Sequence, residues 1–441
     1  MPSRFVLSII GVTLLSLFVP LASAVAQQPS EVTGVSDTVQ APAGDDTSFV
    51  VETSDSAATA AGYEYPMSPQ RKAKLISYSR FVNIWRFVEF FLTLGILALI
   101  LFTGFSAKLR DWAGAARKKF FIVWLFAVLL LIVDYLLNFP FHFYRSFMVE
   151  NQYGFLNQSF VEWLGEDLLG LGISLVIVII PVWFLYWAIN KLKLWWLWIA
   201  VGAIPFMVFF IVIAPVVFSP LFNKFEPLKD KQLEAEILQL AAKAGIEGSD
   251  VFQVDASKQS SKINAYVTGL FGTKRIVLYD TMIDNFETDE IKFAMGHEMG
   301  HYVMNHIWKG LALAVVFIAF ALWLAGKTLQ PVINRFQNRF KFNHLGDIAS
   351  LPLIMIFLTV LSFLFNPVFN SYSRYMERQS DKYGMDISEV SGEAAAVAFD
   401  KLSVFNLSDP DPNPVIEFWF YSHPALNKRI NFVRNYQPPG M

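Results

Sequence analysis

Six long uncharged stretches constrain this chain more than any other feature of its sequence. They cover residues 90–107, 120–133, 168–190, 194–223, 310–326 and 348–373, and the second continues past Asp134 to residue 144. A helix needs about 20 apolar residues to cross the hydrocarbon of a bilayer, within a range of about 17 to 25. All six stretches meet this requirement, the second only if Asp134 lies inside its helix. The sequence therefore predicts a mostly α-helical, polytopic membrane protein.

The composition agrees with a chain that is largely solvated by lipid. Charged residues make up 16% of the 441 residues, against about 25% in soluble domains. The formal net charge of −2 provides no basic field, so nucleic acid is not expected as a partner. The chain has no Cys, which excludes disulfides, thiolate zinc ligands, Cys nucleophiles and prenylation of the chain itself. A bound metal would therefore need His, Asp and Glu ligands, and only six His are present.

The first 66 residues differ from the rest of the sequence. Residues 1–24 contain one positive charge, an apolar core and an Ala-Ser-Ala ending, which is typical of a secretory signal peptide. The alternative is a retained N-terminal transmembrane helix, which would make seven spans instead of six. Residues 25–66 are rich in Ser, Thr, Ala, Pro, Asp and Glu, so we expect a disordered acidic linker.

A polar insert at residues 224–305 interrupts the apolar stretches. The predicted organisation is four spans in 67–223, the insert, two further spans in 306–373 and a polar C-terminal region in 374–441. Inside the insert, apolar residues from Leu233 to Ala241 recur at helical spacing. Short runs rich in β-branched and aromatic residues at 251–254, 265–267 and 275–279 predict a small sheet, and a new helix is expected from Thr288.

The helix expected from Thr288 carries the run His297-Glu298-Met299-Gly300-His301. Positions i and i+4 lie on one helical face, so both imidazoles can bind one tetrahedral Zn²⁺. Glu298 then projects beside the metal, where it can take a proton from water. Because the run lies in the extramembrane α/β insert, it predicts one zinc ion per chain rather than an ordinary exposed helix.

The third protein ligand is not fixed by this run. Met304 and Ile307 occupy the positions at which metzincins have Gly and His, which excludes that class. His306 has rotated off the ligand face, so we expect it to pack or to contact a ligand. The remaining choices are a distant carboxylate or His423.

Glu377 and Asp381 are a second pair at i and i+4 on a predicted helix. One could bind zinc while the other accepts the free N–H of a ligand His. The alternative for Glu377 is a surface ion pair with Arg378. Asp134 has two interpretations that also stay open: an inward-facing, hydrogen-bonded position in the bundle, or the wall of a water-filled cavity.

With these motifs in this order, the chain resembles the type I CAAX prenyl endopeptidases, the branch of the a-factor-converting enzymes. The resemblance spans about residues 68–436 and includes both metal-binding motifs. Further matching runs are 151–157, 220–228, 264–266, 274–281 and 422–429. It implies a bundle of six or seven transmembrane helices that encloses a chamber, with a small α/β catalytic insert of the zincin type.

The resemblance also implies roles for individual residues. Glu377 would be the third zinc ligand, and Asp381 would support the site by orienting a ligand His. The strand Asn264-Ala265-Tyr266 would pair with an extended substrate, which is recognition by β-augmentation. The remaining two site residues would line the cleft and stabilise the oxyanion; they are His423 and Arg429.

The implied activity is that of an integral-membrane zinc metalloendopeptidase that removes the C-terminal tripeptide from prenylated CAAX-box proteins. The expected partners are a peptide or protein substrate and the lipid bilayer, with no obligate protein partner evident. One alternative keeps the chemistry but makes the substrates membrane or exported proteins under quality control, without prenyl dependence. Another is a non-catalytic scaffold or transporter whose structural zinc is closed by a fourth ligand, either His306 or His423.

The side of the membrane that the catalytic insert faces is left open by the sequence. If residues 1–24 are removed, the basic loops at 108–119 and 327–341 count as cytoplasmic. The insert would then face the opposite side, unlike the family orientation. Five basic residues before the first span favour the reverse arrangement; they are Arg71, Lys72, Lys74, Arg80 and Arg86.

Overall fold

The computed structural model describes residues 67–246, 248–270 and 274–437, so the predicted signal segment 1–24 and linker 25–66 lie outside the described residues. Within the described part, six helical stretches are long and apolar enough to cross a membrane. They are Pro69–Phe102, Lys119–Gln152, Phe160–Lys191, Trp195–Leu221, His306–Phe340 and Ile348–Ser388. Each overlaps one of the six apolar stretches of the sequence. The prediction of a mostly α-helical, polytopic membrane protein is thus confirmed.

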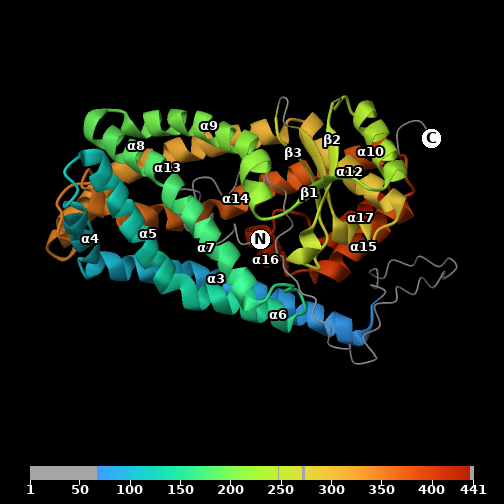
Figure 1. Ribbon diagram of the computed structural model, residues 1–441, viewed down its shortest axis with the longest axis horizontal. Helices are drawn as coiled ribbons and strands as arrows, with labels where there is room; N and C mark the ends of the chain where they lie inside the picture. Colours follow the sequence, from blue (N-terminus) through green and yellow to red (C-terminus); the bar gives the residue numbers. More distant parts are fainter. Residues whose placement is uncertain (1–66, 247, 271–273, 438–441) are drawn as a thin grey trace.

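The long helices lie side by side, roughly along the long axis of the molecule, and form one elongated bundle (Figure 1). In chain order they are α3 (Pro69–Phe102), α5 (Lys119–Phe143), α7 (Phe160–Ile177) with α8 (Ile179–Lys191), α9 (Trp195–Ile213), α13 (His306–Phe340) and α14 (Leu351–Ser388). A cluster of buried apolar side chains, among them Leu97, Phe126 and Ile318, holds them together. The apolar part of α14 is the most buried of the six spans, so this helix is central to the bundle.

Asp134 lies inside α5, as the length of the second apolar stretch requires, and it is buried. The helix continues past it through a π-helical turn at Tyr144–Val149 into α6 (Glu150–Gln152). Asp134 therefore faces inward, whereas a hydrogen bond to a neighbouring helix and an adjoining water-filled cavity both stay predictions.

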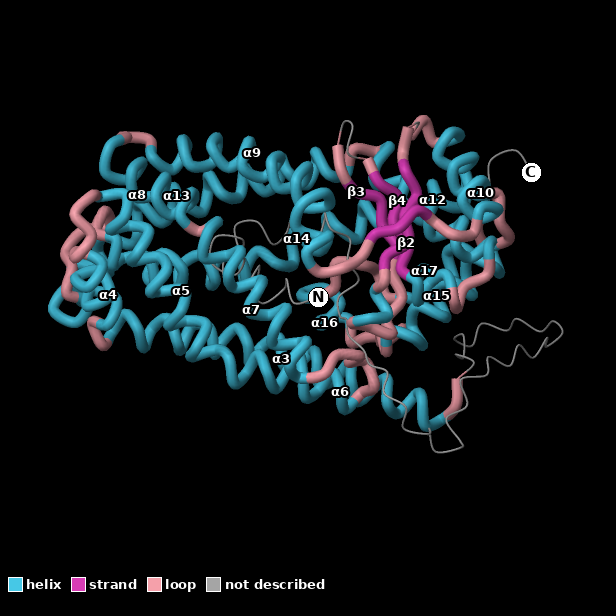
Figure 2. Tube along the Cα trace, in the orientation of Figure 1, coloured by secondary structure: helices cyan, strands magenta, loops and turns pink. Residues whose placement is uncertain are grey.

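The polar insert folds into a four-stranded sheet with helices against it (Figure 2). The strand order is β1 (Phe225–Pro227), β2 (Asp250–Val254), β4 (Arg275–Tyr279) and β3 (Ala265–Thr268). β2 and β4 are parallel, and the other two pairs are antiparallel. The three predicted strand runs correspond to β2, β3 and β4. β1 was not predicted because a strand of three residues carries almost no periodic signal.

Two helices of the insert begin where local capping requires. α10 (Lys231–Lys243) begins after Asp230, whose side chain accepts hydrogen bonds from the N–H groups of residues 232 and 233. α12 (Thr288–Val303) begins at Thr288, as predicted, behind a capping box formed by Glu287 and Glu290. Both caps satisfy backbone donors that the first helical turn leaves open.

Five shorter helices remain, four of them in the half of the molecule that contains the sheet. They are α4 (Phe105–Ala113), α11 (Asp280–Ile283), α15 (Gly392–Asn406), α16 (Pro414–Phe420) and α17 (Leu426–Arg434). All but α4 lie near the sheet, and α4 lies at the opposite end of the bundle (Figure 1). A second cluster of buried apolar residues packs this half; Ile276, Met299 and Phe399 belong to it.

Three glycines allow α12 and α14 to approach closely. A Cβ atom on Gly384 of α14 would lie 3.0 Å from the backbone nitrogen of His297. A Cβ on Gly296 of α12 would lie 3.2 Å from the Cα of Gly384, and one on Gly300 would lie 3.1 Å from the side chain of Tyr383. Larger residues would push the two helices apart, so these glycines decide how near the metal-binding motifs lie to each other.

Candidate metal centre and active site

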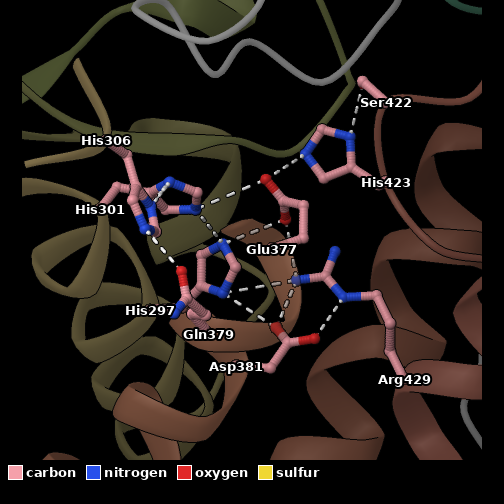
Figure 3. Close-up of polar contacts among 9 residues, drawn as sticks. All are labelled: His297, His301, His306, Glu377, Gln379, Asp381, Ser422, His423 and Arg429. Carbon is pink, nitrogen blue, oxygen red and sulfur yellow. Dashed lines mark hydrogen bonds and ion pairs between the residues drawn. The ribbon is translucent and has the colours of Figure 1, made fainter. Parts of the chain in front are cut away.

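Side chains from α12 and α14 meet at one buried point (Figure 3). The Nε2 atoms of His297 and His301 lie 3.2 Å apart, and each lies 3.4 Å from an oxygen of Glu377. All three residues are buried, and their ligand atoms lie within 4.8 Å of one another. Such separations fit one Zn²⁺, whose bonds to nitrogen and oxygen are about 2.0 to 2.2 Å long. The structure therefore brings together the three residues predicted to bind the metal.

Asp381 lies behind His297, one turn along α14 from Glu377. Its Oδ1 accepts a hydrogen bond of 2.9 Å from His297 Nδ1. This contact fixes the orientation of the ring and directs Nε2 toward the converging ligands, which is the usual arrangement of a metal-binding His. Burial opposes a positive charge on His297, but its hydrogen bonds with Asp381 and Glu377 outweigh burial and raise the pKa of His297 to about 9. At this ring the two carboxylates therefore outweigh burial.

Arg429, from α17, holds Asp381 in turn. Its Nε donates to Oδ2 at 2.9 Å and its Nη2 donates to Oδ1 at 2.5 Å. The same Nη2 lies 3.4 Å from Glu377 Oε2. The guanidinium is nearly buried and is bound in the two-pronged way that suits Arg and carboxylate. It thus compensates the charge of two carboxylates that would otherwise repel each other in a buried site.

His306 supports the second imidazole. Its Nδ1 lies 2.9 Å from His301 Nδ1, and its Nε2 lies 3.3 Å from Gln379 Oε1. The expectation that His306 contacts a ligand rather than the metal agrees with this geometry. Gln379 was not identified from the sequence, because nothing in the local pattern around residues 377–381 distinguishes it from an exposed helical Gln.

Glu298 occupies the position between the metal ligands and the sheet. Burial raises the pKa of Glu298 to about 8, and a hydrogen bond with the backbone of Val267 in β3 opposes that rise. A carboxyl group with a pKa near neutrality can both accept and return a proton. Val267 is a further residue that the sequence motifs did not identify, because it acts through its backbone.

His423 approaches the cluster from the loop between α16 and α17. Its Nε2 lies 3.3 Å from Glu377 Oε1, and its Nδ1 lies 3.0 Å from the hydroxyl of Ser422. Its side chain keeps 34% of its surface exposed, whereas that of Arg429 keeps 8%. His423 is therefore the more accessible of the two residues predicted to stabilise an oxyanion.

The predicted substrate strand is the outer strand of the sheet. The carbonyl of Asn264 accepts a hydrogen bond from the N–H of Tyr279 in β4. Because the backbone direction alternates along a strand, Ala265 and Val267 direct their backbone groups away from β4, and Tyr266 directs its groups toward it. β3 packs against α12, so this edge lies beside Glu298. β3, which follows Asn264 and contains Ala265 and Tyr266, thus packs beside the helix that carries Glu298, and the pairing of these residues with a substrate stays a prediction.

Comparison with known proteins identifies the family. Residues 227–437 match the family model described as peptidase family M48, and residues 64–224 match the one described as CAAX prenyl protease N-terminal, five membrane helices. A Bacillus subtilis protein named uncharacterized metalloprotease YhfN is 34% identical over 366 residues, covering 82% of this chain and 85% of that protein. This chain belongs to peptidase family M48.

Other M48 relatives agree with this membership. The Saccharomyces cerevisiae protein named CAAX prenyl protease 1 is 30% identical and matches over 69% of this chain and 70% of its own length. The crystal structure of S. mikatae Ste24p is similar in fold, with a TM-score of 0.74 and 26% identity over 84% of this chain and 90% of that one. The chain is thus a multi-pass integral-membrane metallopeptidase of this family. A non-catalytic scaffold does not agree with that membership.

Proposed function

We propose that the chain is a zinc-dependent endopeptidase whose zinc ion is held by His297, His301 and Glu377. The observation that carries this proposal is the convergence of two Nε2 atoms and one carboxylate at a buried point, with both Nδ1 atoms occupied by other partners. Zinc bound by such a set supplies Lewis acidity, which polarises a peptide carbonyl and makes water more acidic. Among the described residues this cluster contains three ligands, the number expected of a catalytic rather than a structural site.

Glu298 acts as the general base in this proposal. It takes a proton from the water that attacks the scissile carbonyl and passes that proton to the leaving amine. His423 donates a hydrogen bond to the oxyanion that develops on the carbonyl oxygen. Arg429 is bound to Asp381, so its contribution is to hold Asp381 and His297 in place and to add positive charge near the oxyanion.

The substrate lies along β3 in an extended conformation. The backbone groups of Ala265 and the carbonyl of Val267, which point away from β4, pair with the substrate backbone, while the N–H of Val267 stays with Glu298; such pairing gives affinity without requiring a particular sequence. Relatives are named CAAX prenyl protease, so a prenylated protein that loses its C-terminal tripeptide is one candidate substrate. Exported or membrane polypeptides cleaved without prenyl dependence are a second candidate, and the distribution of charge described below favours them.

The role of Glu298 is tested by Glu298→Gln. This change keeps the size of the side chain but removes the base, so we expect bound zinc to stay near one ion per chain while peptide hydrolysis falls by about 10² to 10⁴-fold. Glu234→Gln is the matched control, because Glu234 of α10 pairs with Lys231 and is not part of the metal cluster. Near-normal hydrolysis by Glu298→Gln would falsify the assignment of the base.

A pair of peptides that differ only in an isoprenoid on one side chain then separates the candidate substrates. Prenyl dependence would appear as a higher kcat/KM for the modified peptide. Equal cleavage of the two peptides would favour the second candidate.

A further inference from the structure

The end of the bundle opposite the sheet has a strongly basic surface, called the basic end below. It consists of three segments: 103–119, which includes α4; the connection 191–194; and 327–347, which comprises the last turns of α13 and the connection after it. They contain five, two and four Lys or Arg residues respectively, against two acidic residues, Asp111 and Asp347. The rest of the chain has more acidic than basic residues, since the whole sequence has 35 Lys and Arg and 37 Asp and Glu. The two ends of the molecule therefore differ in the sign of their charge.

Contacts between the three segments show that they lie together. Arg110 donates a hydrogen bond to the carbonyl of Lys341 at 3.4 Å and pairs with Asp347 at 2.5 Å. The side chain of Asn190 donates to the carbonyl of Gly346 at 2.9 Å. In Figure 1 this end, with α4 and α8, lies at the left, and the sheet lies at the right. The basic end is one continuous face.

One Arg binds both acidic residues of this face. Arg110 forms ion pairs with Asp111 at 2.9 Å and with Asp347 at 2.5 Å. The other ten Lys and Arg residues of the three segments are exposed, and no ion pair joins any of them to another of the described residues. Their charge is thus available to something outside the chain.

Tryptophans lie within or close to the basic end along the chain. Trp112, Trp187, Trp195, Trp198 and Trp323 each lie within five residues of one of its Lys or Arg residues. Four of them expose 40% or more of their surface, and Trp195 is partly buried. Trp is enriched at the level of lipid headgroups, and Lys and Arg are enriched in cytoplasmic loops. A short basic face with Trp nearby along the chain is therefore typical of a cytoplasmic membrane surface.

Of the five basic residues in the first turns of α3, Lys72 and Arg80 are exposed, whereas Arg71 and Arg86 have different surroundings. Arg71 donates to the carbonyl of Val404 at 2.7 Å. Arg86 lies over the rings of Phe420 and Tyr421, at 5.7 and 5.3 Å from their centres. These side chains attach α3 to the catalytic half of the protein, so they are weaker evidence for a cytoplasmic loop than the exposed residues of the basic end. The short connection 153–159, which joins α6 to α7 at the catalytic end of the bundle, has no Lys or Arg.

We propose that the basic end lies in the cytoplasmic leaflet against anionic headgroups, and that the catalytic insert faces the exoplasmic side of the membrane. The substrates are then exported or membrane polypeptides that reach the site from that side; this statement about substrates rests on the proposed function. The sequence of the signal-like segment 1–24 agrees with this orientation. A cleaved signal peptide delivers the residues that follow it to the exoplasmic side, and so does a retained helix whose basic N-terminus is cytoplasmic.

The absence of Cys from the chain allows a direct test with two single-Cys variants. Ala115→Cys places a thiol on the basic end, and Ala235→Cys places one on α10 of the insert; both positions are exposed. A membrane-impermeant maleimide applied to bacterial spheroplasts that produce the full chain should label Ala235→Cys. It should label Ala115→Cys only after permeabilisation. Labelling of Ala115→Cys alone in intact spheroplasts would overturn the proposal.

A second experiment, with a reporter substrate, tests the orientation of the catalytic insert independently of the proposed peptidase activity. An unfolded reporter polypeptide is produced with and without an export signal, together with the full chain or with Glu298→Gln. We expect cleavage of the exported form by the unchanged chain and complete loss of cleavage with Glu298→Gln. Cleavage of the cytoplasmic form alone contradicts the orientation. Cleavage that persists in Glu298→Gln contradicts the proposed function and leaves the labelling result to decide the orientation.

Discussion

The two imidazoles of the metal centre are held by chemically different partners. His297 donates to a carboxylate, Asp381, which Arg429 binds. His301 contacts another imidazole, His306, which contacts the amide oxygen of Gln379. With Nε2 of His301 on the metal, its Nδ1–H is the donor and His306 Nδ1 is the acceptor. The proton on Nε2 of His306 is then directed at Gln379, so Gln379 selects the tautomer that accepts from His301.

A substitution of His306 tests this hydrogen-bonded chain at the residue scale. His306→Phe removes the acceptor for His301, and we expect zinc affinity to fall by about 10 to 100-fold, the range typical of the hydrogen-bond partners of metal ligands. His306→Gln offers an amide oxygen in place of the ring nitrogen and should retain more of the affinity. Competition with a chromogenic chelator measures both. Equal affinities for His306→Phe and the unchanged chain would show that His306 only fills space.

At the scale of elements, the site depends on the close packing of α12 against α14. The ligands lie on two helices that belong to different parts of the chain, and the helices can meet only because Gly296, Gly300 and Gly384 lack side chains at the contact. These glycines lie in helix interiors, where Gly is unfavourable by about 0.5 to 1 kcal/mol relative to Ala. The geometry of the metal site explains why such residues are present at these positions.

Gly384→Ala should damage the site without touching a ligand. Its Cβ would lie 3.0 Å from the nitrogen and 3.3 Å from the Cα of His297, and overpacking of this kind costs about 1 to 3 kcal/mol. We expect a lower Tm in detergent and less bound zinc. Gly172→Ala in α7 is the control, because a Cβ there meets nothing within 4 Å. If both variants behaved alike, close packing at Gly384 would not be what positions the ligands.

The open edge of β3 makes a prediction about the substrate. If the substrate backbone pairs with Ala265 and Val267, only alternate substrate residues point their N–H groups at the strand. N-methylation of one residue at a time should therefore lower kcat/KM with a period of two residues. Each lost hydrogen bond, worth about 1 kcal/mol, should lower it about fivefold. A uniform response along the peptide would count against pairing with this strand.

At the scale of the whole molecule, the metal centre joins the catalytic insert to the membrane bundle. α12 belongs to the half that contains the sheet, whereas α14 begins among the bundle helices and continues out to the site. A buried ion pair between Lys262 of the insert and Glu150 after α5, 3.6 Å apart, is a second connection. A metal ion bound by both His297 and Glu377 should therefore stabilise the folded chain in addition to its role in catalysis.

Removal of the metal tests this connection. Chelation should abolish peptide hydrolysis and lower Tm, and added Zn²⁺ should restore both. Occupancy at 100 times the Kd contributes about 2.7 kcal/mol to the free energy of unfolding. Glu298→Gln, which keeps the ligands, should show the same shift in Tm, whereas His297→Ala should show little shift. A Tm that does not respond to chelation in the unchanged chain would separate metal binding from stability.

The sequence by itself determined the features that depend on neighbouring residues. The lengths of the apolar runs predicted all six spans, the spacing of His297 and His301 placed them on one helical face, and β-branched runs predicted three of the four strands. Each of these follows from local periodicity, which residues can show without their partners.

Only the tertiary structure decided which distant residues complete the site. Glu377 comes 76 positions after His301, and its local surroundings equally suit a surface ion pair; its burial 3.4 Å from His301 Nε2 excludes that ion pair, and its role as a metal ligand belongs to the proposed function. The partners of the imidazoles and the direction of the free edge of β3 depend on how elements pack. The arrangement of the three basic segments at one end also depends on packing, because no local pattern specifies which helix ends will be neighbours.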